Sequence, residues 1–455
     1  MPIAAMDLKA NSLTEGSLTK ALVALAGPMF ISAILQNAQM LIDLFWVGRL
    51  GSEAVAALAI SGTIMMTLFP IVMGMSAGTV ALVSRSVGAG DHEAASDAAG
   101  QSLTVGLLLG VVAGVLGIAA SRPLCRLLGA GPDTLHLAAR FLHISFAGSF
   151  TVFLLFVANS ILQSAGNTVL PMTAMLLANA LNIVLEPLFI YGLLGLPAMG
   201  VAGAALATVI SQGLAAALVI RRLVRGVSGL EVRAPRWRLR GDLAWRILRI
   251  GLPSSGQMLS RSIMSLVLMR IVAFYGTSAV AAYGIGVRFH MILLMPCFAL
   301  GNAAATLVGQ NLGARKPARA QASAWLAVAV AAAILAGSAV ALFAFAPFCI
   351  GFFDPSPPVV EIGVAFLRIA SPFYVFAALG IVLGRALVGA GDAVGPMVTT
   401  IIGLWGIQVP LAIVLSKAVT PATTGIWWSI AVALAANGLM TAAWFQTGRW
   451  KTRRI

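Results

Sequence analysis

Charge is what this sequence most clearly lacks. Only 9% of its 455 residues are Asp, Glu, Lys or Arg, whereas 60% are hydrophobic, and the mean hydropathy is +0.98. A soluble domain is about 25% charged, so the composition excludes a water-soluble globular protein. The apolar runs are about 20 residues or longer and do not alternate with a period of two, which favours helices over a barrel. We therefore predict an all-α integral membrane protein.

Residues that usually carry catalysis or bind metals are also scarce. The three cysteines (Cys125, Cys297 and Cys349) lack the spacing of a metal site, and the four histidines are scattered. No glycine-rich phosphate loop, metalloprotease motif or nucleophile elbow occurs in a usable context. The sequence therefore predicts no enzyme, no metal site and no cofactor.

The net charge of +15 is concentrated in a few loops. The longest connection, 221–246, holds eight arginines, and the end of the chain and the loop around 315–319 are also basic. Basic residues gather on the cytoplasmic side of a membrane, so we place both termini and this connection in the cytoplasm. This placement predicts topology rather than a nucleic-acid partner, although the basic connection can also attract anionic membrane lipid.

Twelve spans are predicted, and they repeat. They cover roughly 20–45, 54–80, 98–120, 136–162, 168–192, 200–220, 247–273, 279–306, 320–346, 360–385, 393–416 and 425–446. The expected parts are a tail (1–19), an N-lobe of six spans (20–220), a basic linker (221–246), a C-lobe of six spans (247–446) and a second tail (447–455).

An internal duplication relates the two lobes. Residues recur at a constant separation along the chain, which we call the repeat offset: Pro28 corresponds to Pro253, Gly51 to Gly276, Gly166 to Gly391, and Gly200 to Gly425. Six spans is an even number, so both copies enter the membrane in the same direction. We therefore predict two parallel six-helix repeats around a central cavity, an arrangement typical of transporters.

Polar side chains inside the spans of the N-lobe gather at one expected depth. Asp43 lies in the outer half of span 1, and Asn179, Asn182 and Glu186 share one face of span 5 because they are three and four residues apart. Thr208 in span 6 has a comparable depth. These side chains can cross-link helices, but two carboxyl groups in a low dielectric cannot both ionise cheaply. That cost favours a proton or sodium site.

The C-lobe has the opposite charge pattern. It carries Leu268 where the N-lobe has Asp43, and it has no acid well inside a span. Arg261 lies in the middle of span 7, where the N-lobe has Gln36, and Arg288 lies in span 8. These arginines either bond helix-end carbonyls and reach the interface, or contact anionic cargo. The candidate cavity contacts are Gln36, Asn37, Asn179, Arg261 and Arg288.

The ordered set of motifs resembles the multidrug and toxic compound extrusion (MATE) family over about residues 15–447. The motifs that carry the resemblance are Gly27-Pro28, the run from Asp43 to Gly51, Val87-Gly88-Ala89-Gly90-Asp91, Gln163-Ser164-Ala165-Gly166-Asn167, Asn182 to Glu186-Pro187, Gly203 to Thr208, and Val308 to Ala314. Arg261 stands where the NorM-like branch keeps a further acid, so the pattern is closer to the DinF-like branch.

The resemblance implies an antiporter that exports organic, often cationic and amphiphilic, compounds in exchange for protons or sodium ions by alternating access. The residues that match the family's coupling site are Asp43, Asn182, Glu186 (where the family usually has Asp) and Thr208, and they would also hold Na⁺. We expect a small-molecule cargo, membrane lipid as the surroundings, a monomer and a location in a bacterial inner membrane. The alternatives are a lipid-linked saccharide flippase of the same superfamily, and an integral-membrane enzyme or channel. The flippase would need a cationic cavity, and the enzyme a polar catalytic cluster.

Overall fold

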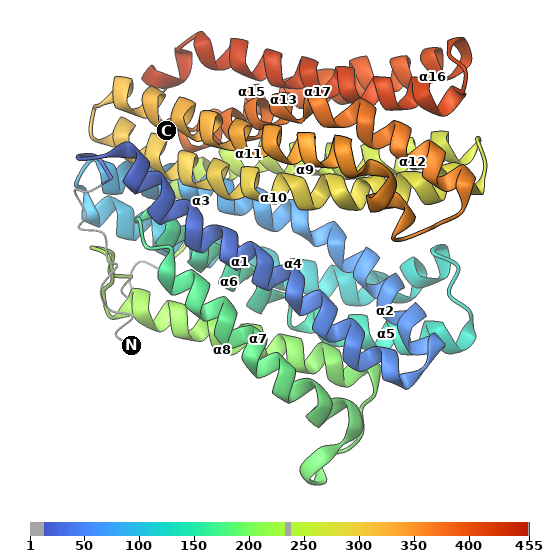
Figure 1. Cartoon of the computed structure of the whole chain (residues 1–455). Helices are drawn as coiled ribbons and strands as arrows, with labels where there is room; N and C mark the ends of the chain where they lie inside the picture. The colour runs from blue at the N-terminus through green and yellow to red at the C-terminus, as the bar shows by residue number, and fades with distance from the viewer. Residues whose placement is uncertain (1–12, 233–237, 454) are drawn as a thin grey trace. The chain divides into compact units, whose positions relative to one another are not determined.

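The structure is a computed structural model that describes residues 13–232, 238–453 and 455, and this part of the chain is helical (Figure 1). The helices of the first half are α1 (Leu18–Val47), α2 (Ser52–Met65), α3 (Phe69–Gly88), α4 (His92–Leu127), α5 (Pro132–Ala147), α6 (Ser149–Ser164), α7 (Val169–Tyr191) and α8 (Val201–Val224). Those of the second half are α9 (Gly241–Ala273), α10 (Thr277–Gly313), α11 (Pro317–Gly351), α12 (Pro357–Ala370), α13 (Tyr374–Ala378), α14 (Gly384–Gly389), α15 (Val394–Ile401), α16 (Val409–Ala418) and α17 (Ala422–Gln446).

These helices account for the predicted spans. Within the described residues, ten helical stretches are long and apolar enough to cross a membrane, and some of them join consecutive helices, as Ser52–Gly88 joins α2 and α3. The number is eleven if α5 and α6, which meet at a 47° bend, form one span. Helix α9 takes the place of predicted span 7 and is 33 residues long, but its serines and arginines make it more polar than the others. The chain is therefore a multi-pass membrane protein, as predicted.

The repeat offset found in the sequence also separates the helix boundaries. Helix starts that are related in this way are Ser52 and Thr277, His92 and Pro317, Pro132 and Pro357, and Val169 and Val394. Two glycines with positive φ are related too, because Gly166 has φ 90° and Gly391 has φ 87°. Both occupy a backbone conformation that side chains rarely adopt. The duplication therefore preserves turns as well as helices.

By its internal contacts the chain divides into two units. The first consists of Gly27–Ser255 with the described residues up to Gly16, and the second of Ser17–Ala26 with Gly256–Ile455. The opening turns of α9 thus belong to the first unit, where they pack on α3. Gly74 and Gly78 of α3 make this packing close, because a methyl group at either position would collide with the backbone of Gly251 or Ile247.

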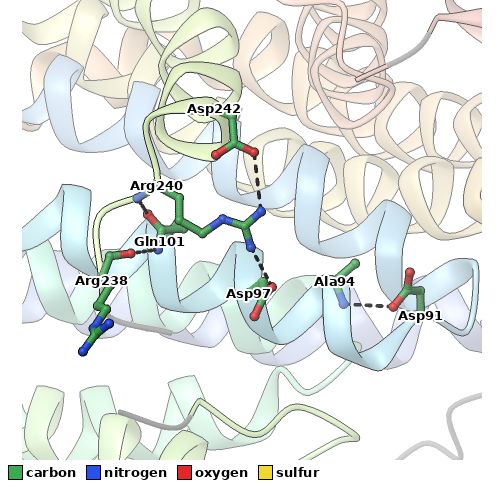
Figure 2. A network of polar contacts seen from close by, with 7 residues as sticks. All are labelled: Asp91, Ala94, Asp97, Gln101, Arg238, Arg240 and Asp242. Atoms are coloured by element: carbon green, nitrogen blue, oxygen red, sulfur yellow. Dashed lines mark hydrogen bonds and ion pairs between the residues drawn. The ribbon is translucent and has the colours of Figure 1, made fainter. Parts of the chain in front are cut away.

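The predicted linker is partly helical and is bound to α4 within the first unit. Helix α8 runs to Val224 and α9 starts at Gly241, so both ends of 221–246 are helical, while residues 233–237 lie outside the described residues, as do residues 1–12 of the predicted tail. In Figure 2, Gln101 of α4 accepts from the backbone N of Arg240 at 2.8 Å and donates to the carbonyl of Arg238. Arg240 also pairs with Asp97 at 3.2 Å and with Asp242 at 3.6 Å. The linker therefore has a defined path over α4.

An equivalent loop in each half holds the segment that follows the last helix of that half. In the first unit, Asn167 Nδ2 donates to Ser228 Oγ at 3.3 Å. In the second, Asp392 pairs with Arg453 at 2.7 Å and accepts from Trp444 Nε1 at 3.0 Å. The repeat offset relates Asn167 to Asp392, and it also relates Ser228 to Arg453. The start of the linker and the end of the described chain are therefore structural counterparts.

A candidate cation-coupling site in the first unit

Asp43 and Glu186 are positioned by α1 and α7, which pack together near their C-terminal ends. Val47 lies one turn after Asp43, and Ile190 lies one turn after Glu186; both are buried in the same apolar cluster. Residues four apart share one face of a helix. The packing that buries Val47 and Ile190 therefore turns the two carboxyl groups toward each other.

Helix α8 brings a hydroxyl group to the same place. It lies beside α7 (Figure 1), and the two approach closely at Gly203, where a methyl group would lie 2.6 Å from the backbone C and O of Phe189. Real Cβ atoms essentially never come that near, so this approach requires glycine. Thr208, further along α8, then reaches Asn182 of α7, with 3.2 Å between Nδ2 and Oγ1.

Asn182 lies at the centre of the resulting cluster. Its amide group has an atom 3.3 Å from Asp43 Oδ1, 3.3 Å from Glu186 Oε1 and 3.2 Å from Thr208 Oγ1. The two carboxyl groups are also within hydrogen-bonding range of each other. Asn182 and Glu186 are fully buried, and within the described residues Glu186 Oε2 has no hydrogen-bond partner. An unsatisfied buried acceptor costs about 1–3 kcal/mol, so a bound proton or cation would stabilise this cluster.

The amide of Asn182 can face the carboxyl groups in two ways. With its nitrogen toward them, it donates to Asp43 and Glu186, and its oxygen accepts from Thr208 Oγ1. With its oxygen toward them, Asp43, Glu186 and Asn182 present oxygen atoms on one side, and Nδ2 donates to Thr208. The first arrangement satisfies the amide group when no cation is present, because the amide nitrogen donates and carboxylates accept, although it leaves Glu186 Oε2 unsatisfied. The second offers a hard cation the oxygen ligands that it prefers.

The other predicted polar residues of this region divide into two groups. Asn179 is buried and donates to the carbonyl of Leu35 in α1 at 2.6 Å, so it ties α7 to α1 beside the cluster. Asn37 is exposed and donates to the carbonyl of Ala33 at 2.9 Å, one turn earlier in its own helix. Gln36 is partly exposed. Of these three, Asn179 alone connects to a neighbouring helix by a side-chain hydrogen bond in the described part of the chain.

Arginines gather in the second unit. Arg261 of α9 is partly exposed, but its Nε is buried and has no partner among the described residues. Arg385 of α14 lies over Gly301 of α10, where a methyl group would be 3.1 Å from its Cγ. Electrostatic interactions link Arg261 to Arg385 and to His290. Arg288 is exposed and, within the described residues, has no hydrogen bond or ion pair, so the structure does not bring it into this cluster.

A family model settles the identity. The MatE model matches residues 28–188 and matches again at residues 253–414. The chain belongs to the MATE family. The two matched segments begin at Pro28 and Pro253, which are corresponding residues of the internal duplication.

Relatives of this MATE protein match it over two thirds of its length or more. It is 28% identical over 451 residues to a probable multidrug resistance protein, YpnP, of Bacillus subtilis, a match that covers 98% of this chain and 99% of that one. A FAD transporter of Shewanella oneidensis is 29% identical over 318 residues, covering 68% and 69%. A solved MOP superfamily transporter from Pyrococcus furiosus, described as having a binding pocket of reverse polarity, has a TM-score of 0.88 at 28% identity and covers 97% of this chain and 98% of its own.

MATE membership makes this chain a transporter and not an enzyme, and its multidrug resistance relatives indicate export of small molecules. The flippase alternative is not favoured by these relatives. Placement in the DinF-like branch stays a prediction, as do the coupling roles of Asp43, Asn182, Glu186 and Thr208.

Several polar residues of this MATE protein escaped the sequence interpretation. Arg385 was missed because its span was predicted to end at that residue, where an arginine is expected to reach the interface. In the second unit, Gln257 donates to Thr400 Oγ1 at 2.8 Å and to the carbonyl of Pro396 at 3.1 Å, and Trp405 donates to Ser260 at 2.8 Å. Gln257 and Ser260 precede Arg261 on the same helix, so the polarity of α9 was the signal that could have revealed this network.

Proposed function

We propose that the protein exports small organic molecules in exchange for protons or sodium ions, and that Asp43, Asn182, Glu186 and Thr208 bind the coupling ion. The observation that carries the proposal is the pair of carboxyl groups around one buried amide, with one oxygen of Glu186 unsatisfied among the described residues. Carboxylates inside a membrane protein are costly and usually functional. Helix cross-linking alone would not need two acids.

In this proposal, ion binding changes the orientation of the Asn182 amide group relative to the two carboxyl groups. A proton shared by Asp43 and Glu186, or a sodium ion between them, removes the repulsion between the carboxyl groups. A sodium ion favours the orientation in which the amide oxygen of Asn182 faces the carboxyl groups. Asp43 comes from α1, and Asn182 and Glu186 come from α7. The ion drives export only if it binds one arrangement of these helices more tightly than the other. The coupling free energy is therefore the difference between two affinities and not the affinity itself.

The expected cargo is a cationic amphiphile, as the family resemblance implies. The Shewanella relative adds a second candidate, because its name gives FAD, an anionic compound, as its cargo. We place both termini in the cytoplasm on the basis of the basic loops, and the protein in a bacterial inner membrane as the family resemblance implies.

Gradient-driven uptake into proteoliposomes tests this function, with the sodium and pH gradients imposed separately. The cargo panel contains a cationic dye, a zwitterionic drug and FAD. Asp43→Asn is expected to abolish uptake and to leave the unfolding temperature unchanged, because the amide preserves shape but cannot cycle charge. Glu53→Gln is the matched control: Glu53 is an exposed acid in the first turn of α2 and is expected to leave transport unchanged.

Two results separate the coupling ions. Transport that requires sodium at fixed pH assigns Na⁺ to the cluster, whereas transport driven by a pH gradient without sodium assigns the proton. Gradient-driven transport that persists in well-folded Asp43→Asn would remove the cluster from the coupling mechanism.

A further inference from the structure

Arg261 and Arg385 form a pair of like charges inside the second unit that the established family activity does not explain. Arg261 Nε is buried without a hydrogen-bond partner, and within the described part of the chain neither arginine forms a side-chain hydrogen bond or ion pair. Their helices both contact Pro396 of α15, because Gln257 of α9 donates to its carbonyl at 3.1 Å and a Cβ atom at Gly384 of α14 would lie 3.6 Å from its Cβ. The two guanidinium groups are close enough to interact electrostatically. Both side chains are partly exposed, so neither is sealed into the core. Two unpaired cations close together in a membrane-spanning region are unfavourable, because low dielectric strengthens their repulsion.

The second unit has no carboxylate available to neutralise this pair. Its acids are Asp354, Glu361 and Asp392. Asp354 lies between α11 and α12 and accepts from the N and Oγ of Ser356, and Glu361 is exposed near the start of α12. Asp392 is bound to Arg453 and Trp444. A neutralising anion must therefore come from outside the unit.

The fold holds Arg385 in position for such an anion. A π-helical turn, Leu379–Leu383, directly precedes α14, and turns of this kind shift the direction of the side chains that follow and often occur at functional sites. Gly301 of α10 leaves room for the stem of Arg385. Because the stem packs against a neighbouring helix, the guanidinium group loses less conformational entropy when it binds a ligand.

Other polar groups stand beside Arg261. His290 of α10 interacts electrostatically with Arg261, and its ring lies 5.2 Å from the ring of Tyr374, measured between centroids. The hydroxyl of Tyr374 is buried and has no hydrogen-bond partner among the described residues. The surroundings of the two arginines therefore contain donors but no carboxylate.

We propose that Arg261 and Arg385 together form an anion-binding subsite, which takes a phosphate or carboxylate group of the transported compound or of a lipid. The inference rests on the proposed function, since it assigns part of the cargo to the second unit while the coupling ion stays in the first. Arginine suits this role because its planar group binds two oxygens of a phosphate or carboxylate at once. The subsite extends the cargo range to anionic and zwitterionic compounds.

Binding of inorganic pyrophosphate to the purified full-length protein, in nanodiscs of zwitterionic lipid, tests the subsite. Arg261→Gln and Arg385→Ser introduce the residues found at the corresponding positions of the first half, Gln36 and Ser160. Each is expected to weaken pyrophosphate binding roughly ten-fold, the size of a lost charge-assisted hydrogen bond. Arg288→Gln, which removes the exposed arginine, is the control and should leave binding unchanged.

The unfolding temperature without added anion separates this role from a structural one. If the two arginines hold helices together, either substitution lowers the unfolding temperature. The subsite predicts that either substitution raises the unfolding temperature, because removing one of two like charges removes their repulsion. Pyrophosphate should also raise the unfolding temperature of the unmodified protein. An unmodified protein that pyrophosphate neither binds nor stabilises at millimolar concentration would overturn the proposal, whatever the variants do. Equal pyrophosphate binding by the unmodified protein and all variants would also overturn the proposal.

Anionic lipid and transport identify the occupant. If binding is lost in the variants and phosphatidylglycerol in the nanodisc competes with pyrophosphate, the subsite holds a lipid headgroup; without competition it serves cargo. Uptake of FAD should fall more than uptake of the cationic dye in both variants, whereas Asp43→Asn should abolish uptake of both compounds. Failure of the subsite can therefore be distinguished from failure of the coupling site.

Discussion

The two halves of this protein share a backbone plan and differ in charge. The first half carries Asp43, Asn182, Glu186 and Thr208 where the second carries Leu268, Ile407, Leu411 and Ala433. The second carries Arg261, Arg385 and His290 where the first carries Gln36, Ser160 and Met65. Helix boundaries and turn glycines are retained at the repeat offset, because packing and backbone conformation constrain them everywhere. Charge is needed only where an ion or ligand is bound, so it could diverge after the duplication.

The strongest test of this difference in charge replaces Glu186 with leucine, the residue type at the corresponding position of the second half, Leu411. Glu186→Leu is expected to lower gradient-driven transport on the order of 100-fold or more, because an apolar side chain cannot bind the ion with different affinity in two states. The unfolding temperature should not fall, since exchanging buried ionisable groups for well-packed apolar ones is often neutral or stabilising, by about 1–4 kcal/mol. Glu186→Asp is the control and should retain transport, because it keeps a carboxyl group. Transport that survives Glu186→Leu would show that the contrast has no part in coupling.

The two equivalent loop contacts give a prediction of intermediate size. Arg453→Ala leaves Asp392, whose side chain is 4% exposed, with Trp444 and a backbone N–H but without its cation. The expected loss is roughly 1–3 kcal/mol of unfolding free energy, reduced from that of a fully buried pair because Arg453 is itself partly exposed.

Ser228→Ala is the matched substitution in the first unit, and it removes one 3.3 Å hydrogen bond between neutral side chains. It should cost no more than about 0.5 kcal/mol. Thermal unfolding of the two variants in the same detergent compares them directly. Equal losses would mean that the charge of Asp392 adds nothing to this shared contact.

The smallest effect is expected where the linker meets α4 (Figure 2). Asp97→Asn removes the ion pair with Arg240, whose side chain is 54% exposed, and should change the unfolding free energy by less than about 1 kcal/mol. Gln101→Ala should cost more, because Gln101 bonds the backbone of both Arg238 and Arg240. Hydrogen exchange at Arg240 reports the effect locally. A larger loss from Asp97→Asn than from Gln101→Ala would assign the stability of the linker to charge.

The sequence predicted the carboxyl cluster because simple helix geometry was sufficient there. Asn182 and Glu186 are one turn apart in an unbroken α-helix, so counting residues placed them correctly. Counting residues is not sufficient in the second half. The π-helical turns at Leu379–Leu383 and Ile402–Gln408 change which side chains share a helix face after them. The predicted span 136–162 also conceals the bend at Gly148, where the side chain of Val209 fills the space that a Cβ atom would need. Such tertiary contacts leave no local pattern in the sequence.

The division of α1 and α9 between the two units bears on how the chain is made. Domains generally fold in order as they leave the ribosome. Ser17–Ala26 precede most of the first unit in the chain, yet they make their contacts in the second unit, which is synthesised after it. The first unit in turn needs the opening turns of α9, which pack on Gly74 and Gly78 of α3. A nascent chain that ends in the basic linker therefore lacks part of its own first unit. If the protein is produced as two co-expressed fragments, the division should follow Ser255 rather than fall in the linker.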